Sequence, residues 1–378
     1  MPARYPTSEG GGYLLYSLAM QSLRQKIGQM FLVSCRGESV TREEHLVFEQ
    51  CGFGGFILFK ENCREPKQIL DLCRSLWQSA EGSPPFLAID QEGGRVHRLP
   101  EPFTHFPSAA RVGESRNRDL VYRAGKATAA ELALAGINLN FAPVLDVNSN
   151  PQNPVIGDRS FGRTPGQVIE TASAWAQGLR DGGIIPCAKH FPGHGDTDKD
   201  SHFALPVVGK TLAQLEAVEL LPFVHACRNG IEALMTAHVR YAALDSEFPA
   251  TLSERIVTGL LRHRLGFDGV VFSDDMEMKA ISDNYGPEES VTLGARAGID
   301  VFLFCHDLSR AVEAWEFLCD EAERDAALRA RAENSYRRIT ELKRRYLKAI
   351  AGIAENELEE RLKQLDHRRL VDEIQGNL

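Results

Sequence analysis

Eight short apolar runs, separated by longer segments of helical pattern, restrict the fold of this chain more than any other feature. The runs are four to eight residues long and lie at 30–35, 55–59, 86–90, 138–145, 184–190, 233–238, 269–273 and 301–304. Amphipathic segments at 14–27, 66–79, 118–135, 167–180 and 212–228 predict helices. Alternation of strand and helix indicates a parallel sheet covered by helices. Eight continuously apolar strands, each followed by a crossover, predict a TIM-type (β/α)8 barrel of the α/β class.

The alternative fold is an open, doubly wound parallel sheet. Such a sheet normally carries a glycine-rich phosphate turn after its first strand. Here the first apolar run is followed by Arg36-Gly37-Glu38-Ser39, and no GxGxxG pattern is present. The sequence therefore favours the barrel.

The pattern divides the chain into one catalytic domain and two flanking segments. Residues 1–13, which include three consecutive glycines, predict a flexible N-terminal tail. Residues 14–345 hold the barrel, and the composition becomes charged and helical after about residue 320. Residues 346–378 predict a C-terminal helical extension that packs back on the barrel.

Composition excludes several classes of partner. The formal net charge is -9, so nucleic acid and anionic membranes are unsuitable partners, and no run reaches the length of a membrane helix. The eight cysteines show no CxxC pairing, and several lie inside apolar runs, which is typical of reduced thiols. With no clear signal peptide, we expect a cytoplasmic protein. We also expect it to be a monomer.

Polar residues follow most of the predicted strands. Asp90 and Asp146 end the third and fourth, Lys189 and His190 the fifth, His238 the sixth and Asp274 the seventh. In a barrel, the carboxyl ends of all strands open into one mouth, where active sites are built. One such residue can be a simple strand cap, but the whole set predicts a site.

Residues 189–202 carry three histidines, three aspartates and two lysines, which invites a metal-site interpretation. His190 and His194 have the spacing of a helical zinc pair, but Pro192 and Gly193 between them disfavour a helix. Asp196, Asp198 and Asp200 resemble the start of a calcium loop, yet its glycine and terminal glutamate positions hold Ser201 and Val207. We therefore expect no metal and no other cofactor.

Acid–base chemistry with a carboxylate nucleophile remains, because neither GxSxG nor GxxxxGK occurs. Asp274 ends a strand and is fixed by the backbone, which makes it a candidate nucleophile. Asp275 follows it and faces the other way if the strand continues. Asp200 and His202 are two residues apart, so in an extended loop they point the same way, and His202 is a candidate general acid/base oriented by Asp200.

Five segments together resemble one enzyme family, the β-N-acetylglucosaminidases of glycoside hydrolase family three. They are residues 89–99, 140–147, 157–162, 189–202 and 272–276, which match in the right order within about residues 20–345. The resemblance implies a barrel, a retaining mechanism, Asp274 as nucleophile and Asp200–His202 as the acid/base pair. It also implies that N-acetylglucosamine is bound by Asp90, Arg98, Arg159, Lys189 and His190. We add His238 as a further candidate.

The resemblance points to a single-domain cytoplasmic enzyme that releases N-acetylglucosamine from muropeptides during peptidoglycan recycling. Three other functions stay open. A β-glucosidase of the same family usually places its acid/base on a second domain and lacks this loop. A phosphorylase would use phosphate instead of water as acceptor. An inactive sugar-binding protein is disfavoured by the presence of Asp200, His202 and Asp274.

Overall fold

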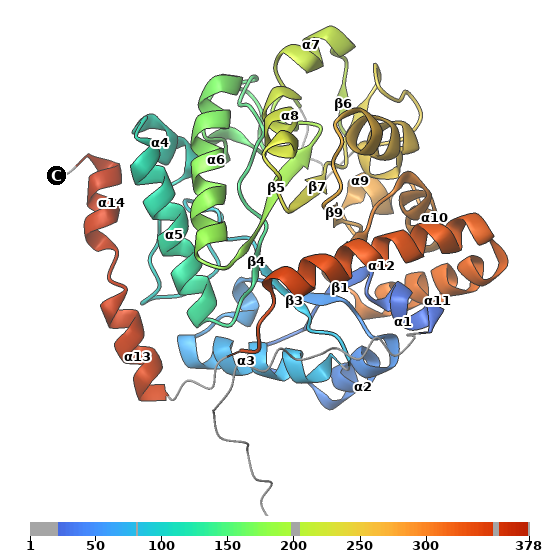
Figure 1. The fold of residues 1–378 in the computed structure, drawn as a ribbon, viewed down its shortest axis with the longest axis horizontal. Coiled ribbons are helices and arrows are strands. Elements are labelled where there is room, and N and C mark those ends of the chain that lie inside the picture. The colour runs from blue at the N-terminus through green and yellow to red at the C-terminus, as the bar shows by residue number, and fades with distance from the viewer. Residues whose placement is uncertain (1–21, 81, 198–204, 351–354, 377–378) are drawn as a thin grey trace, which may run out of the picture.

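The computed structural model describes residues 22–80, 82–197, 205–350 and 355–376, and it contains a closed barrel of parallel strands with helices outside (Figure 1). The predicted (β/α)8 fold is thereby confirmed. The strands lie in the order β1, β10, β9, β7, β5, β4, β3 and β2 around the barrel. Their bounds are Phe31–Ser34 (β1), Gly55–Leu58 (β2), Phe86–Ile89 (β3), Leu139–Asn140 (β4), Ile185–Phe191 (β5), Ala233–Thr236 (β7), Val270–Asp275 (β9) and Val301–Phe304 (β10).

Helices cover the outer face of the barrel. In chain order they are α1 (Leu23–Gly28), α2 (Arg42–Cys51), α3 (Pro66–Ser79), α4 (Ala109–Glu114), α5 (Arg118–Leu134), α6 (Pro165–Asp181), α7 (Leu212–Ala217), α8 (Leu221–Arg228), α9 (Lys279–Ser282), α10 (Pro287–Ala297), α11 (Leu308–Arg324), α12 (Ala326–Tyr346), α13 (Glu355–Gln364) and α14 (Arg368–Gln375). Short helical turns η1 (Lys60–Asn62), η2 (Gly157–Arg159) and η3 (Ala250–Leu252), a π-helical segment η4 (Arg255–Arg264), and the two-stranded pair β6 (Val207–Val208) and β8 (Arg240–Tyr241) complete the fold.

Two predicted helices have different bounds in the structure. The helix expected at 14–27 begins at Leu23, because Ser22 caps it and exchanges hydrogen bonds with Gln25; residues before 22 lie outside the described part. The helix expected at 212–228 is two helices, α7 and α8. The break holds Glu219, a buried carboxylate that accepts a hydrogen bond from Lys210, and Pro222 then starts α8 in its first turn.

The fourth and seventh strands depart from regular pairing. The run 138–145 forms a ladder only over Leu139–Asn140, and Pro143 interrupts it because proline has no N–H to donate. In the β9–β10 pair, Val301 is opposite Phe272 but Leu303 is opposite Asp275, so β9 contains one extra residue. This bulge lies immediately before the cavity described below.

The C-terminal helices pack in two places (Figure 1). Helix α12 runs across the amino end of the barrel, where Lys343 Nζ lies 2.7 Å from both Gln29 Oε1 and the Gly54 carbonyl oxygen, just before β1 and β2. Helices α13 and α14 lie along the side of the barrel, against α3, α4 and α5. No helix among the described residues is long and apolar enough to cross a lipid bilayer.

Candidate active site

A cavity of about 570 Å³ opens at the carboxyl end of the barrel strands. This volume suits a small organic ligand. Residues that follow or end β2, β3, β5, β9 and β10 line it, as a barrel site requires. They include the predicted Asp90, Arg98, Arg159, Lys189, His190 and Asp274.

Glu92 is the centre of the buried charge network in this cavity. Arg159 donates from Nε and Nη2 to its two carboxylate oxygens, both at 2.9 Å, and Lys189 Nζ lies 2.7 Å away. Burial alone disfavours the charged form of Glu92, but the two cations outweigh it and hold the pKa of this carboxyl well below its usual value. The network therefore fixes the heads of Arg159 and Lys189.

Lys189 also holds Asp90, which ends β3. The Lys189 ammonium lies 2.6 Å from Asp90 Oδ1, and these carboxylates raise the pKa of the lysine despite its burial. Arg98 Nη2 lies 3.9 Å from the other oxygen of Asp90. Among the described residues, Arg98 Nε is buried with no hydrogen-bond partner, so it has a donor to offer to a ligand oxygen.

Asp146 orients the imidazole of His190 through its Nδ1 atom. His190 Nδ1 lies 2.6 Å from Asp146 Oδ2, and the backbone N–H of His194 donates to Asp146 Oδ1 at 2.6 Å. The pKa of Asp146 is lowered, because these partners outweigh its burial. With Nδ1 held by a carboxylate, Nε2 of His190 faces the cavity and lies 3.5 Å from Arg159 Nη2.

Asp274 stands at the end of β9 on the cavity wall. Its Oδ1 accepts a hydrogen bond of 2.9 Å from the backbone N–H of Asp275. Burial opposes its ionisation, but the nearby His190 and His238 outweigh burial and lower the pKa of the carboxyl. Asp274 is thus an ionised, fixed carboxylate that lines the same cavity as Arg159 and Lys189.

Residues 22–342 match the family described as "Glycosyl hydrolase family 3 N terminal domain". The chain belongs to glycosyl hydrolase family 3. It is 36% identical to "Beta-hexosaminidase A" of Pseudoalteromonas piscicida over 90% of this chain and 61% of that protein. It is 39% identical to "Beta-hexosaminidase" of Neisseria meningitidis serogroup C over 71% of this chain and 75% of the relative.

A solved family 3 structure agrees with these sequence relatives. The β-N-acetylglucosaminidase from Paenibacillus sp. str. FPU-7 superposes with a TM-score of 0.87 and 37% identity, over 94% of this chain and 68% of that protein. The chain thus spans between three fifths and three quarters of the length of these three proteins. The resemblance inferred from the five sequence segments is confirmed at the level of the family.

Two predicted members of this family 3 site, Asp200 and His202, lie outside the described residues. The segments that flank them are well anchored. On one side, the Tyr241 hydroxyl donates to the Gly193 carbonyl at 2.7 Å. On the other, Lys210 lies 3.0 Å from Asp196 and 2.6 Å from Glu219, so it links both ends of the loop to the barrel.

His238 does not line the cavity in the way that the sequence suggested. It is completely buried, and its ring nitrogens contact Thr251 Oγ1 at 2.8 Å and the carbonyl oxygen of Asp275 at 2.9 Å. Burial lowers its pKa. His238 therefore supports the backbone next to Asp274, since neither nitrogen is left to bind a sugar.

Asp275 is the second correction. Regular alternation would turn it away from Asp274, but the bulge in β9 brings both carboxylates to the cavity. Sequence reasoning also did not single out Glu92, Phe59 or His306. Glu92 lies within residues 89–99, one of the segments that carry the family resemblance, so this segment could have identified it as a site residue. Phe59 and His306 follow strands and belong to no polar motif, so no sequence signal marked them.

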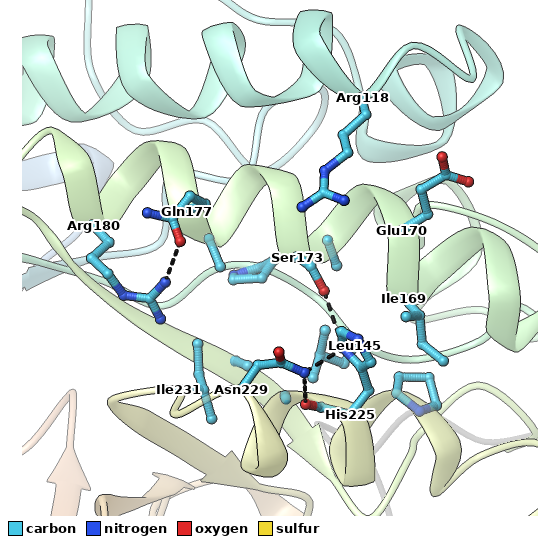
Figure 2. Close-up of a pocket in the computed structure, with 16 residues that line it drawn as sticks. Arg118, Leu145, Ile169, Glu170, Ser173, Gln177, Arg180, His225, Asn229 and Ile231 are labelled. Carbon is cyan, nitrogen blue, oxygen red and sulfur yellow. Dashed lines mark hydrogen bonds between the residues drawn. The ribbon is translucent and has the colours of Figure 1, made fainter.

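A second cavity lies on the outer wall of the barrel between α6 and α8 (Figure 2). It holds about 530 Å³ and has an alanine-rich floor, including Ala172, Ala176 and Ala188. Its imidazole, His225, contacts Ser173 and Asn229 of the same cavity. It lies away from the strand ends that carry Asp90, Lys189 and Asp274, none of which lines it. Within the described residues, no group of three or more His, Cys, Asp or Glu side chains is arranged to hold a metal ion.

Proposed function

We propose that this family 3 chain is a retaining exo-β-N-acetylglucosaminidase that removes a terminal β-linked N-acetylglucosamine. Asp274 is the nucleophile. The Asp200–His202 pair is the acid/base. The observation that carries the proposal is that one cavity holds both an ionised strand-end carboxylate, Asp274, and a fixed set of charges around Glu92.

The reaction has two steps. Asp274 attacks the anomeric carbon while His202 gives its proton to the departing oxygen, so the glycosidic bond breaks as a carboxylate–sugar bond forms. His202 then takes a proton from water, the water oxygen bonds to the anomeric carbon, and Asp274 is released. An imidazole suits both transfers near neutral pH because its unperturbed pKa is about 6.5.

The remaining polar groups suit the non-reducing sugar. Sugar hydroxyls need directional, charged partners, and Arg98, Asp90 and His190 each present a donor or acceptor to the cavity. Arg159 and Lys189, held by Glu92, complete the set. We further propose muropeptide fragments as substrates, a cytoplasmic location and a monomeric state.

One substrate panel tests the proposal against its alternatives. We expect wild-type protein to hydrolyse 4-nitrophenyl N-acetyl-β-glucosaminide and to be much slower on the plain β-glucoside. The opposite preference would indicate a β-glucosidase. Appearance of a sugar 1-phosphate when phosphate is added would indicate a phosphorylase, and inertness toward both aryl glycosides would indicate a binding protein.

A further inference from the structure

We propose that His306 and Phe59 form the surface that contacts the leaving-group sugar, a second pyranose ring bound on the outer side of the scissile bond. This rests on the proposed exo-hydrolysis. His306 follows β10 and Phe59 follows β2, so two strands on either side of β1 place them together. Both line the same cavity as Asp274.

The exposure of the lining side chains distinguishes the closed end of the cavity from its mouth. Lys189 and Glu92, with side chains only 2% and 3% exposed, form its closed end. The His306 side chain is 69% exposed and stands at the mouth. An exo-enzyme buries the terminal sugar and leaves the rest of the substrate toward solvent. The leaving group therefore lies toward the mouth, on the side of the cavity where His306 is exposed and Phe59 lies next to it.

The two rings offer a platform suited to a sugar. Their planes are nearly parallel, at 20°, with centroids 6.2 Å apart. Phe59 is half-buried, so its position is set by packing. Flat apolar faces pack against the C–H side of a pyranose, and an adjacent N–H adds direction through hydrogen bonds to ring or hydroxyl oxygens.

Asp275 fixes His306 for this task. His306 Nε2 lies 3.3 Å from Asp275 Oδ2, which leaves Nδ1 as a donor available to a ligand. The other Asp275 oxygen accepts backbone N–H bonds from Glu277 at 3.1 Å and Cys305 at 3.3 Å. The bulge in β9 thus gives consecutive carboxylates different partners: Asp274 faces the terminal sugar, and Asp275 holds the imidazole at the mouth.

The charged groups around the imidazole are mostly acidic. Asp275 ends β9, Glu277 follows it, and Glu61 lies in η1; the hydrogen bond to Asp275 is the main cause of the raised pKa of His306. Glu277 itself accepts the backbone N–H of His306 at 2.6 Å. These acidic neighbours favour the protonated form of His306, in which Nδ1 is a donor, and they balance its charge locally, which suits a neutral hydroxylated ring.

The test compares two substrates that share the terminal sugar. One is N,N′-diacetylchitobiose, whose leaving group is a pyranose. The other is N-acetyl-β-glucosaminyl fluoride, whose leaving atom is too small to reach the mouth. We expect His306→Ala and Phe59→Ala to lower kcat/KM for the disaccharide by about fivefold to tenfold and to leave the fluoride within about twofold, since each lost contact is modest.

Control variants separate this role from structural damage. Lys279→Ala changes another exposed side chain of the cavity mouth and should leave the ratio of the two rates unchanged. His306→Gln, which keeps a donor, should restore part of the disaccharide rate. An equal loss on both substrates, or no loss on the disaccharide, would overturn the proposal. If the wild-type protein hydrolysed neither substrate, the exo-hydrolase function itself would fail instead.

A second measurement does not depend on turnover of a disaccharide. A mechanism-based fluorosugar that keeps the 2-acetamido group, such as a 5-fluoro glycosyl fluoride, traps the glycosyl-enzyme, and an acceptor sugar bound at the mouth should accelerate its reactivation. We expect added N-acetylglucosamine to reactivate wild-type protein severalfold faster than it reactivates His306→Ala, with equal rates in buffer alone. Equal acceleration of both proteins would contradict the proposed contact.

Discussion

Arg159 donates two parallel hydrogen bonds to Glu92, from Nε and Nη2, each 2.9 Å long. This bidentate pair is buried and shares its carboxylate with Lys189. Breaking a buried pair leaves charges without a partner, which costs more than breaking an exposed one. Glu92 is therefore the residue whose loss should disturb the largest part of the site.

We predict that Glu92→Gln lowers kcat/KM by about 100-fold and destabilises the fold by about 3 kcal/mol. Because the pKa of Glu92 is depressed in the folded state, its contribution to stability is present above its unfolded pKa and is lost as the pH falls below it. Thermal melts from pH 7 to pH 3 should therefore show a steeper decline for wild type than for the variant. As a control, Asp158→Asn breaks an exposed pair with Arg95 and should lower the free energy of unfolding by less than about 1 kcal/mol. If the melting temperatures of wild type and Glu92→Gln declined in parallel as the pH falls, this account would be contradicted.

Asp274→Ala should abolish turnover while the protein remains folded. A nucleophile contributes several kcal/mol to the barrier, so a loss of several orders of magnitude is expected. Circular dichroism and steady-state rates measure the two effects. A mechanism-based fluorosugar that keeps the 2-acetamido group should label Asp274 in peptide mass spectra, and labelling of Asp275 would move the nucleophile by one residue.

For the acid/base pair, the prediction concerns leaving groups. His202→Ala should lose much more rate on a disaccharide than on an activated aryl glycoside, because nitrophenol departs without a proton. Azide should restore part of the deglycosylation step, and Asp200→Ala with the double variant should behave like His202→Ala. His194→Ala is the control. Burial lowers the pKa of His194 to about 4 and its Nδ1 lies 2.8 Å from Thr197 Oγ1, so it should lose rate equally on both substrates; the reverse pattern would exchange the roles of the two histidines.

Lys343 should make stability depend on pH between neutral and alkaline conditions. Burial lowers its pKa from 10.5 to about 7. The folded protein therefore binds fewer protons than the unfolded chain between these values, and stability contributed by this group rises with pH across that window. From pH 7 to pH 9, the urea midpoint of wild type should therefore rise relative to that of Lys343→Met. A constant difference between the two midpoints would show that the amine does not titrate in this range.

Removal of metal ions should leave activity unchanged. The loop lacks the glycine and glutamate of a calcium site and the helix of a zinc pair. Dialysis against EDTA followed by the aryl glycoside assay tests this. Activity that falls and returns with zinc or calcium would identify the histidine-rich segment as a metal site.

The barrel could be predicted from sequence because strand identity is local information. Runs such as 301–304 are apolar over their whole length, and their number and spacing leave few topologies. Asp90, Lys189 and Asp274 could be placed at the mouth for the same reason, since they end strands. The break near Glu219 instead holds an ion pair between this buried carboxylate and Lys210, which helical periodicity cannot reveal.

The site residues that the sequence did not predict depend on contacts between residues far apart in the chain. Glu92 and Arg159 are 67 residues apart in sequence, and only the fold brings them together. His238 looked like a site residue because it follows a strand, yet Thr251 occupies one of its nitrogens from a segment with no recognisable signal. Strand position therefore predicts which residues approach the mouth but not which way each one turns.

Because β9 contains one extra residue, the number of residues in this strand decides which carboxylates reach the cavity. Loss of one residue between Phe272 and Asp275 would restore regular alternation with β10 and rotate one carboxylate out of the cavity. Substitutions there change a single side chain, whereas a one-residue deletion would exchange the positions of nucleophile and neighbour. In mutational libraries of this protein, shortening this strand should be far less tolerated than changing any of its side chains other than Asp274.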